Sequence, residues 1–84
     1  MTEQISLLDS VIVALGDMHD DSSVPRNVRA KIDVMIATLK QQDSEISTKV
    51  NKCLSHLDEI SSDVNLQSYT RTQLWNIMSI LEKL

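Results

Sequence analysis

The sequence contains very few of the residues that form turns or covalent cross-links. Its 84 residues include no phenylalanine, one glycine (Gly16), one proline (Pro25) and one cysteine (Cys53). A β-sandwich or β-barrel needs many turns, and turns use glycine and proline, so their scarcity favours long helices. A single cysteine cannot form an internal disulfide, which excludes a small fold held together by disulfides.

Long hydrophobic runs are also missing. The longest unbroken apolar stretch covers residues 11–15, whereas a membrane-spanning helix needs ~20 apolar residues. The first four residues do not form the charged and then apolar pattern of a secretion signal. We therefore expect a cytoplasmic protein that makes no contact with a membrane.

Basic charge is scarce. The chain has 8 Lys and Arg against 12 Asp and Glu, which gives a net charge of −4. Proteins that bind the phosphate backbone of nucleic acids gather Lys and Arg on one face. Here the one such group, formed by Arg26, Arg29 and Lys31, directly follows an aspartate-rich stretch over residues 17–21. The composition therefore disfavours nucleic acid as a partner.

Apolar residues recur with helical spacing in four stretches of the chain. Steps of three and four residues place each set on one side of a helix, which is the pattern of helices that share a core. The expected helices span approximately residues 3–20, 25–41, 44–61 and 67–83. Their apolar stripes are, in order, Ile5, Leu8, Val11, Ile12, Leu15 and Met18; Val24, Val28, Ile32, Met35, Ile36 and Leu39; Ile46, Val50, Cys53, Leu54, Leu57 and Ile60; and Leu66, Leu74, Ile77, Met78 and Leu81, with Thr70 in the remaining turn. The sequence thus predicts an all-α four-helix bundle.

Several residues mark where these helices begin and end. Pro25 suits the first position of a helix, because its missing N–H would have no partner there. Proline also disfavours helical geometry at the preceding residue, so the first helix should end near Asp20. Thr2 and Ser44 are candidates for the N-caps of the first and third helices.

The chain divides into two halves with the same pattern. Residues 1–42 align with residues 43–84 without a gap, and apolar character is kept at most stripe positions. The identical pairs are Glu3/Glu45, Leu15/Leu57, Asp21/Asp63, Arg29/Arg71 and Leu39/Leu81. We interpret the chain as a single helical domain, residues 1–84, in which one helical hairpin is used twice, over 1–42 and 43–84. The two hairpins should close into one four-helix unit, because neither can cover its apolar face alone.

Both halves also repeat one unfavourable arrangement of charge. Asp21 and Asp63 lie at the C-terminal ends of predicted helices. Arg29 and Arg71 lie in the opening turns of the helices that follow, so all four charges oppose the helix dipole. A repeated unfavourable arrangement suggests a compensating contact. We therefore predict ion pairs between Asp21 and Arg29, and between Asp63 and Arg71, across the two turns.

Three segments together resemble a known family. They are residues 21–29 (Asp-Ser-Ser-Val-Pro-Arg-Asn-Val-Arg), residues 57–63 (Leu-Asp-Glu-Ile-Ser-Ser-Asp) and residues 74–84 (Leu-Trp-Asn-Ile-Met-Ser-Ile-Leu-Glu-Lys-Leu). Their order and the chain length are similar to those of a family of small archaeal proteins of uncharacterised function. The chain departs from the family pattern over residues 40–52 and at Leu66-Gln67, where the family has proline. The resemblance implies a four-helix bundle of bromodomain-like fold in a cytosolic archaeal protein, and it implies no known activity, cofactor or functional residue.

Two groups of residues could carry chemistry. Cys53 and His56 lie three residues apart, so both could contact one metal ion; we expect instead that Cys53 is a small core residue and that His56 lies on the surface. His19 stands among Asp17, Asp20 and Asp21, but the spacing and glycine of a calcium loop are absent, so we expect a solvated acidic cluster. There is no glycine-rich phosphate loop, serine-nucleophile motif or zinc-protease motif. We therefore expect no metal, no cofactor and no enzymatic activity.

Surplus apolar residues are the clearest functional signal. At about 100° per residue, Trp75 and Ile80 fall on opposite sides of the stripe that contains Leu74, and Val13 and Val34 also lie off their stripes. Such residues can be covered by neighbouring helices or can stand singly on the surface. A tryptophan beside a helical face is also a common anchor for a partner. Trp75, Ile80, Val13 and Val34 are therefore the candidate residues of a partner interface.

Together these features favour a non-enzymatic interaction module, a rigid bundle that binds another protein or itself through helix faces. The alternative is an accessory protein of nucleic acid or of a ribonucleoprotein, which would use Arg26, Arg29, Lys31 and Arg71 near the turns. The dependence of binding on salt separates the two hypotheses, because phosphate contacts weaken steeply as the salt concentration rises. The sequence indicates no small-molecule ligand.

Overall fold

Four helices account for most of the chain in the computed structural model, which describes the backbone of residues 2–84 and the side chains of residues 6–84. The helices are α1 (Thr2–His19), α2 (Arg26–Lys40), α3 (Ile46–Ser61) and α4 (Ser68–Glu82). Every predicted helix is present, and each end lies within two residues of its predicted position. The prediction of an all-α four-helix fold is confirmed.

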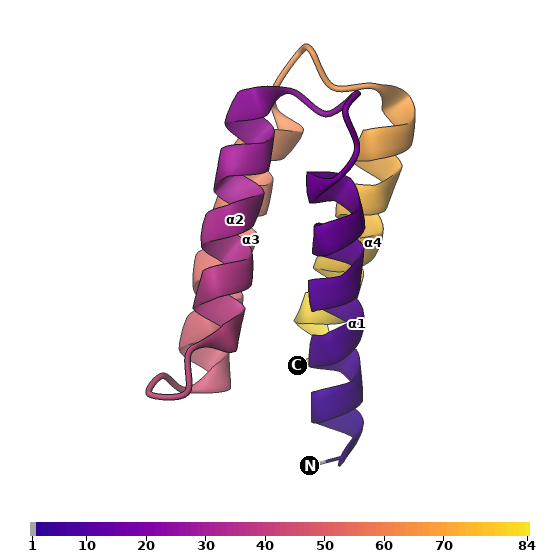
Figure 1. Cartoon of the computed structure of the whole chain (residues 1–84). Helices are drawn as coiled ribbons and strands as arrows, with labels where there is room; N and C mark the ends of the chain where they lie inside the picture. Colours follow the sequence, from indigo (N-terminus) through magenta and orange to yellow (C-terminus); the bar gives the residue numbers. More distant parts are fainter. Residues whose placement is uncertain (1) are drawn as a thin grey trace.

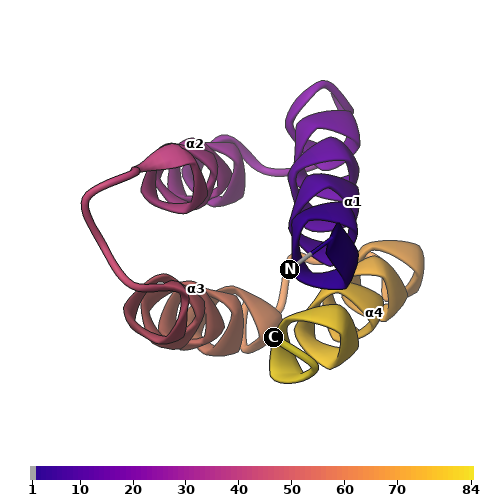
Figure 2. The same ribbon diagram turned by 90° about the horizontal axis from the view of Figure 1, so that it is seen from below.

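Successive helices run in opposite directions, so each is antiparallel to the next (Figure 1). Viewed from below, they occupy the corners of a four-sided bundle (Figure 2). The backbone of each helix lies close to those of its two neighbours, in the pairs α1·α2, α2·α3, α3·α4 and α1·α4, while within the described residues the backbones of helices on each diagonal do not approach one another closely. The overall extents are 36 × 20 × 20 Å.

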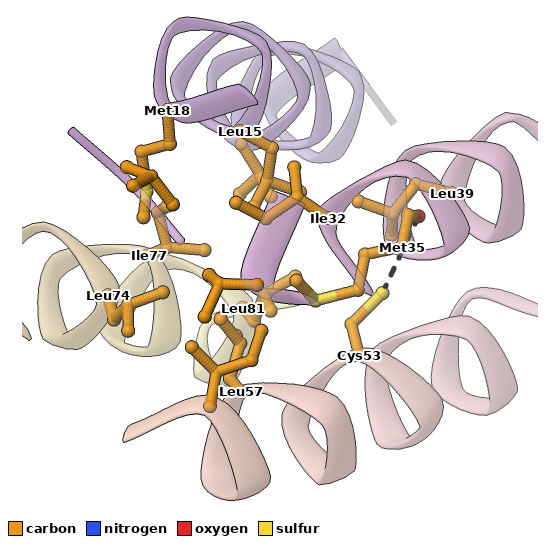
Figure 3. Packing of buried hydrophobic residues seen from close by; sticks show 14 of the residues in the cluster. Leu15, Met18, Ile32, Met35, Leu39, Cys53, Leu57, Leu74, Ile77 and Leu81 are labelled. Atoms are coloured by element: carbon orange, nitrogen blue, oxygen red, sulfur yellow. Dashed lines mark hydrogen bonds between the residues drawn. The ribbon is translucent and has the colours of Figure 1, made fainter. Parts of the chain in front are cut away.

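The core lies along the axis of the bundle and receives side chains from all four helices. Leu15, Ile32, Leu57 and Leu74, one from each helix, are completely buried and meet near the centre (Figure 3). Every predicted stripe residue from Leu8 onward is either buried or packed against the buried cluster. The side chain of Ile5 lies outside the described residues. Helical periodicity therefore located the core correctly.

The two halves of the chain have matching secondary structure. The first and last residues of α4 have numbers 42 higher than those of α2. The last residue of α3 likewise has a number 42 higher than the last residue of α1. Buried residues also coincide under a shift of 42 residues, at Val11/Cys53, Leu15/Leu57, Met18/Ile60, Val24/Leu66, Val28/Thr70, Ile32/Leu74, Met35/Ile77 and Leu39/Leu81. Secondary structure and burial therefore match between residues 1–42 and 43–84 under this shift.

The turn that joins the two helices of each hairpin repeats two of its backbone hydrogen bonds. In the first turn the Asp21 N–H donates to Met18 O (3.2 Å) and the Val24 N–H donates to Asp21 O (3.1 Å). In the second turn the Asp63 N–H donates to Ile60 O (3.0 Å), and the Leu66 N–H donates to Asp63 O (3.3 Å). The two turns therefore direct their following helices in the same way.

Two predicted helix starts are wrong by one or two residues. Pro25 is the N-cap of α2 rather than its first helical residue, because its backbone is extended (ψ 148°) while its carbonyl accepts the first helical bond, from the Arg29 N–H (3.0 Å). Glu45, not Ser44, occupies the N-cap of α3, because its carbonyl accepts from the Lys49 N–H (3.1 Å). The Ser44 Oγ instead donates to the Gln41 Oε1 (3.4 Å). The side chain of Thr2, the other predicted cap, lies outside the described residues.

Gly16 lies inside α1, where glycine is unfavourable. It does not have a positive φ angle, and a Cβ added at this position meets no atom within 4 Å. We expect Gly16→Ala to raise the free energy of unfolding by about 0.5–1 kcal/mol, because alanine loses less backbone entropy in a helix. Urea denaturation followed by circular dichroism measures the change. Ala14→Gly, two residues earlier in the same helix, is the matched control and should lower stability; a less stable Gly16→Ala protein would contradict the prediction.

Candidate functional site

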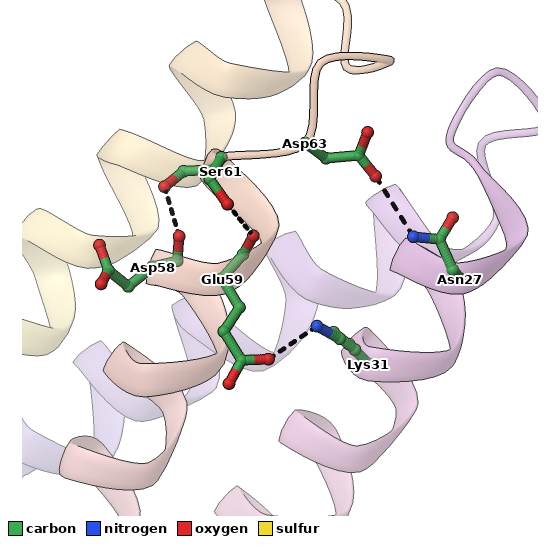
Figure 4. Close-up of polar contacts among 7 residues, drawn as sticks. Asn27, Lys31, Asp58, Glu59, Ser61 and Asp63 are labelled. Carbon is green, nitrogen blue, oxygen red and sulfur yellow. Dashed lines mark hydrogen bonds and ion pairs between the residues drawn. The ribbon is translucent and has the colours of Figure 1, made fainter.

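Asp63 connects the second turn to the opposite hairpin. Its Oδ1 accepts from the Asn65 N–H (2.8 Å), and its Oδ2 accepts from the Asn27 Nδ2 at the start of α2 (3.2 Å; Figure 4). The backbone bond from Asn65 and the side-chain bond from Asn27 hold the pKa of the Asp63 carboxyl below its ordinary value. This carboxylate therefore orders its own turn and joins it to α2.

The aspartate carboxylates of the two turns accept hydrogen bonds from groups other than the predicted arginines. The carboxylate of Asp21 accepts from the N–H of Ser23 (2.9 Å) and from its hydroxyl (2.7 Å). Arg71 does reach Asp63, but its guanidinium donates to the main-chain carbonyl (3.0 Å) rather than to the carboxylate. Neither predicted pair is among the ion pairs of the described residues. In both turns the carboxylate is already engaged, because it accepts the N–H of the residue two positions later.

Two contacts between ionisable side chains, Lys31–Glu59 and His19–Asp33, join neighbouring helices at the same end of the bundle. Lys31 Nζ of α2 lies 2.7 Å from Glu59 Oε2 of α3 (Figure 4). The hydrogen bond and charge of Lys31 lower the pKa of Glu59. His19 Nε2 at the end of α1 lies 3.0 Å from Asp33 Oδ1 of α2, and its Nδ1 lies 3.5 Å from Asp20 Oδ1. These contacts fix the relative positions of the helices.

The lowered pKa values of three carboxyl groups link stability to pH. Hydrogen bonds from Ser23 lower the pKa of Asp21, and those described above lower the pKa values of Glu59 and Asp63. A carboxyl group with a lowered pKa in the folded state stabilises that state at neutral pH. This contribution is lost as the pH falls through the folded-state pKa. The turn end of the bundle should therefore loosen in acid.

The basic residues of the alternative nucleic-acid hypothesis are partly engaged within the protein. Lys31 pairs with Glu59, and the Arg71 guanidinium donates to the Asp63 carbonyl. The Nε atom of Arg29 is buried and has no hydrogen-bond partner among the described residues. Two of the four residues in that hypothesis, Lys31 and Arg71, are thus engaged within the protein, which weakens the case for a phosphate-binding surface.

Cys53 lies in the core, as predicted. It is completely buried, and its Sγ donates to the carbonyl of Met35 (3.8 Å; Figure 3). Burial raises the pKa of this thiol to about 11, so it stays protonated and unreactive near neutral pH. His56 is half-buried rather than on the surface, and its Nδ1 has no hydrogen-bond partner among the described residues. The described residues contain no group of three or more His, Cys, Asp or Glu side chains placed to hold a metal ion.

The four apolar candidates do not share one surface. Val13, Val34 and Trp75 are 63%, 50% and 57% exposed, whereas Ile80 is partly buried against the core. Val34 lies on α2, whose backbone within the described residues does not closely approach that of α4, the helix of Trp75 and Ile80. Val13 and Ile80 lie on α1 and α4, which are in contact. The structure therefore places Val13 and Ile80 on adjacent helices and leaves Val34 on another face.

A groove of about 230 Å³ follows the contact between α1 and α4. A more open hollow on the outer side of α1 adjoins it; this hollow is lined by α1 residues alone, includes Val13, and shares Ala14 and Asp17 with the groove. We call the combined surface the α1–α4 groove; it is lined by Asp9, Ser10, Val13, Ala14, Asp17, Met18, Gln73, Asn76, Ile77 and Ile80. Trp75 is not among its lining residues, since it lies on another side of α4 from Ile77 and Ile80.

Sequence reasoning found Val13 and Ile80 but missed the rest of this groove. The apolar periodicity places Met18 in the core stripe and makes no prediction for Ala14, Gln73 or Asn76. One signal was available in α1, where Val13 and Ala14 extend the apolar surface beyond the core stripe. A helix whose apolar surface is wider than its core contact needs a further partner to cover it. Which helix would border that surface depends on the arrangement of the bundle.

Acidic and polar groups border the α1–α4 groove. Asp9 and Asp17 are exposed on α1, four residues on either side of Val13. No Lys or Arg occurs over residues 2–19, so no basic side chain of α1 neutralises these aspartates. On the α4 side, the Oε1 of Gln73 is buried and has no hydrogen-bond donor among the described residues. The groove thus combines an apolar floor with an acidic rim and one unsatisfied acceptor.

Comparison with known proteins places the chain in a family. The sequence pattern of the uncharacterised protein family UPF0147 matches residues 1–84. This chain belongs to the UPF0147 family. The UPF0147 protein of Methanocaldococcus jannaschii is 35% identical over 77 residues, which cover 92% of this chain and 83% of the relative. The UPF0147 protein of Metallosphaera sedula is 37% identical over 75 residues, which cover 89% and 84% of the two chains.

A solved structure supports the fold of this UPF0147 chain. The crystal structure of the unknown function protein MMP1188 superimposes with a TM-score of 0.88 at 35% sequence identity, and the match covers 93% of this chain and 89% of that one. The resemblance to a small archaeal family of uncharacterised proteins is confirmed. None of the described helices combines the length and apolar character needed to cross a membrane.

Proposed function

We propose that this UPF0147 protein is a cytoplasmic, non-enzymatic interaction module that binds another protein through the α1–α4 groove. The observation that carries the proposal is the exposed apolar surface of α1. Val13 is 63% exposed and lines the α1 part of this surface beside Ala14, while Ile80 lines the part between the two helices. Contiguous apolar surface in a concave site is typical of binding sites, because covering it removes that surface from water.

Side chains outside this surface stabilise the fold and do not supply a reactive thiol. The only thiol is buried, with its pKa raised to about 11. Several carboxylates outside the groove join helices and turns through contacts such as Lys31–Glu59 and Asn27–Asp63. The residues of the groove stand on two helices whose inner faces pack into one core. These features support a rigid presenting surface.

Photo-crosslinking from single positions tests the proposal. Val13→Cys and Val34→Cys each introduce an exposed thiol, and the buried Cys53 should not compete for a maleimide reagent. Each variant is labelled with a benzophenone maleimide and irradiated in extract of the cells that make the protein. We expect a discrete adduct from position 13 and none of the same mass from position 34, because only position 13 lies in the groove.

Competition makes the result specific. Excess unlabelled wild-type protein should abolish the adduct from position 13, whereas excess Val13→Lys protein should not, because a lysine would occupy the apolar site. Circular dichroism should show that Val13→Lys keeps its helical content, since position 13 is exposed. The absence of a discrete adduct at position 13, or equal competition by both unlabelled proteins, would contradict the proposal.

A further inference from the structure

Both aromatic residues of the chain lie exposed on α4. Tyr69 and Trp75 are its one tyrosine and its one tryptophan, and it has no phenylalanine. Each is more than half exposed, so the core of the bundle is built without an aromatic ring. Aromatic side chains bring a large apolar area to a contact, and tryptophan and tyrosine are common anchors of protein interfaces. The aromatic composition of α4 is therefore that of an interface helix.

Charge is also scarce on α4. Its only charged residues are Arg71 and Glu82, whereas α2 contains five and α3 contains four. The centres of protein interfaces are depleted in charged residues. α4 occupies one corner of the bundle between α1 and α3 (Figure 2), so its outward side is covered by no other helix of the described chain. The exposed side of α4 is thus both aromatic and poor in charge.

One line of residues along α4 is its own complement when reversed. We call it the α4 stripe; its members are Arg71, Trp75, Met78 and Glu82. They follow one another at steps of four, three and four residues, which places them within about 60° of arc on one side of the helix. This side lies away from Ile80, which lines the α1–α4 groove. Trp75 and Glu82 are exposed, and the other two members are partly exposed.

We propose that two copies of this protein pair through the α4 stripe, with their α4 helices antiparallel about a two-fold axis between residues 76 and 77. Glu82 of each copy then meets Arg71 of the other. The same axis brings Trp75 of each copy onto Met78 of the other, and a methionine sulfur packs favourably against an aromatic ring. A parallel pair would instead place each charge against its own counterpart, and such like-charge contacts suppress a pairing. The antiparallel pair is the isologous contact expected of a symmetric dimer.

The pairing also compensates an unfavourable arrangement of charge within α4. Arg71 lies near the N-terminal end of α4 and Glu82 is its last residue, so both charges oppose the helix dipole. Neither belongs to an ion pair of the described residues. A guanidinium carries five N–H donors, and Arg71 donates one hydrogen bond within the described chain, to the carbonyl of Asp63. In the antiparallel pair the carboxylate of Glu82 lies beside that guanidinium, near the positive end of the other α4.

Sedimentation equilibrium of the intact protein tests the pairing. We expect a dimer whose population rises with concentration, and Trp75→Ala should raise its dissociation constant at least roughly tenfold, because each copy loses an anchor. Tyr69→Ala is the matched control: Tyr69 is a similarly exposed aromatic residue of the same helix, but it lies outside the α4 stripe, so the dissociation constant should stay nearly unchanged. Both variants should keep the helical circular dichroism of the wild type.

The fluorescence of the wild-type protein gives a second measurement that needs no substitution. Trp75 is the only tryptophan, so its emission reports on the α4 stripe alone. We expect the emission to shift to shorter wavelength as the protein concentration rises through the dissociation constant, because the ring leaves water for the contact with Met78.

A matched pair of charge reversals tests the contact between Glu82 and Arg71. Glu82→Lys and Asp43→Lys each change the net charge from −4 to −2, and a smaller net charge reduces the general repulsion between copies. At position 82 the lysine would face Arg71 of the other copy, so Glu82→Lys should weaken the dimer in spite of the smaller net charge. Asp43 lies in the exposed loop between α2 and α3, and Asp43→Lys should not weaken it.

Three outcomes would overturn the pairing. The first is a wild-type protein that stays monomeric at millimolar concentration with unshifted fluorescence, which would leave the α4 stripe to a different protein. The second is an equal effect of Trp75→Ala and Tyr69→Ala, and the third is an equal effect of the two lysine variants, since either would place the dimer contact elsewhere. The α1–α4 groove lies on the other side of α4, so none of these outcomes decides the photo-crosslinking at position 13.

Discussion

Leu15→Ala and Leu57→Ala are each expected to lower the free energy of unfolding by about 2–5 kcal/mol. Both leucines are completely buried, and truncation removes buried methyl groups and leaves a cavity in the core. In a domain of this size each kcal/mol corresponds to a change in melting temperature of roughly 4–8 °C. Because the two residues occupy equivalent positions in the two hairpins, their costs should be similar. Urea denaturation followed by circular dichroism gives both values.

A surface substitution is the control for this pair. Val64 is 87% exposed, so Val64→Ala should change stability by less than about 0.5 kcal/mol. A cost for Leu15→Ala as small as that of Val64→Ala would show that the bundle does not pack as described. A large cost at Leu57 with a negligible one at Leu15 would instead show that the first hairpin packs loosely.

Separating the two hairpins should abolish most of the structure. A break between Gln42 and Asp43, in the exposed loop between α2 and α3, gives fragments 1–42 and 43–84. In each fragment the apolar stripes lose the facing hairpin, and an isolated short helix is marginal in water. We expect the equimolar mixture to show much more helical circular dichroism than the sum of the separate fragments, because the contacts α1·α4 and α2·α3 re-form.

A variant fragment shows whether the recovered helix reflects the native core. Fragment 43–84 with Leu57→Asp should not restore helical structure when mixed with 1–42, because a buried carboxylate without a partner is costly. A mixture whose spectrum equals the sum of its parts, with each fragment already fully helical, would mean that each hairpin folds without the other. The prediction that neither hairpin covers its own apolar face would then be wrong.

Local features of the fold were accessible from the sequence, and their errors have a physical cause. The stripe containing Leu15 and the stripe containing Leu57 located both the helices and the core, because helical spacing is a property of consecutive residues. The starts at Pro25 and Ser44 were misplaced by one or two residues. A cap is defined by the carbonyl that accepts the first helical bond, and several neighbouring residues can supply it.

The turn contacts needed atomic detail. The sequence predicted an ion pair between Asp63 and Arg71; the structure brings the two residues together, but Arg71 donates to the main-chain carbonyl of Asp63 and not to its carboxylate. The carboxylate is occupied by Asn65 and Asn27. Which oxygen accepts which donor depends on turn geometry and on a residue 36 positions away in the chain, and neither follows from residue spacing.

By itself the sequence determined four amphipathic helices and their shared core, because periodicity decides which side of each helix avoids water. Only the tertiary structure decided that Val13 lies on a helix beside that of Ile80 and that Val34 faces elsewhere. Side-by-side placement of helices is set by packing between residues distant in the chain. A groove shared by two helices therefore exists only once the bundle has formed.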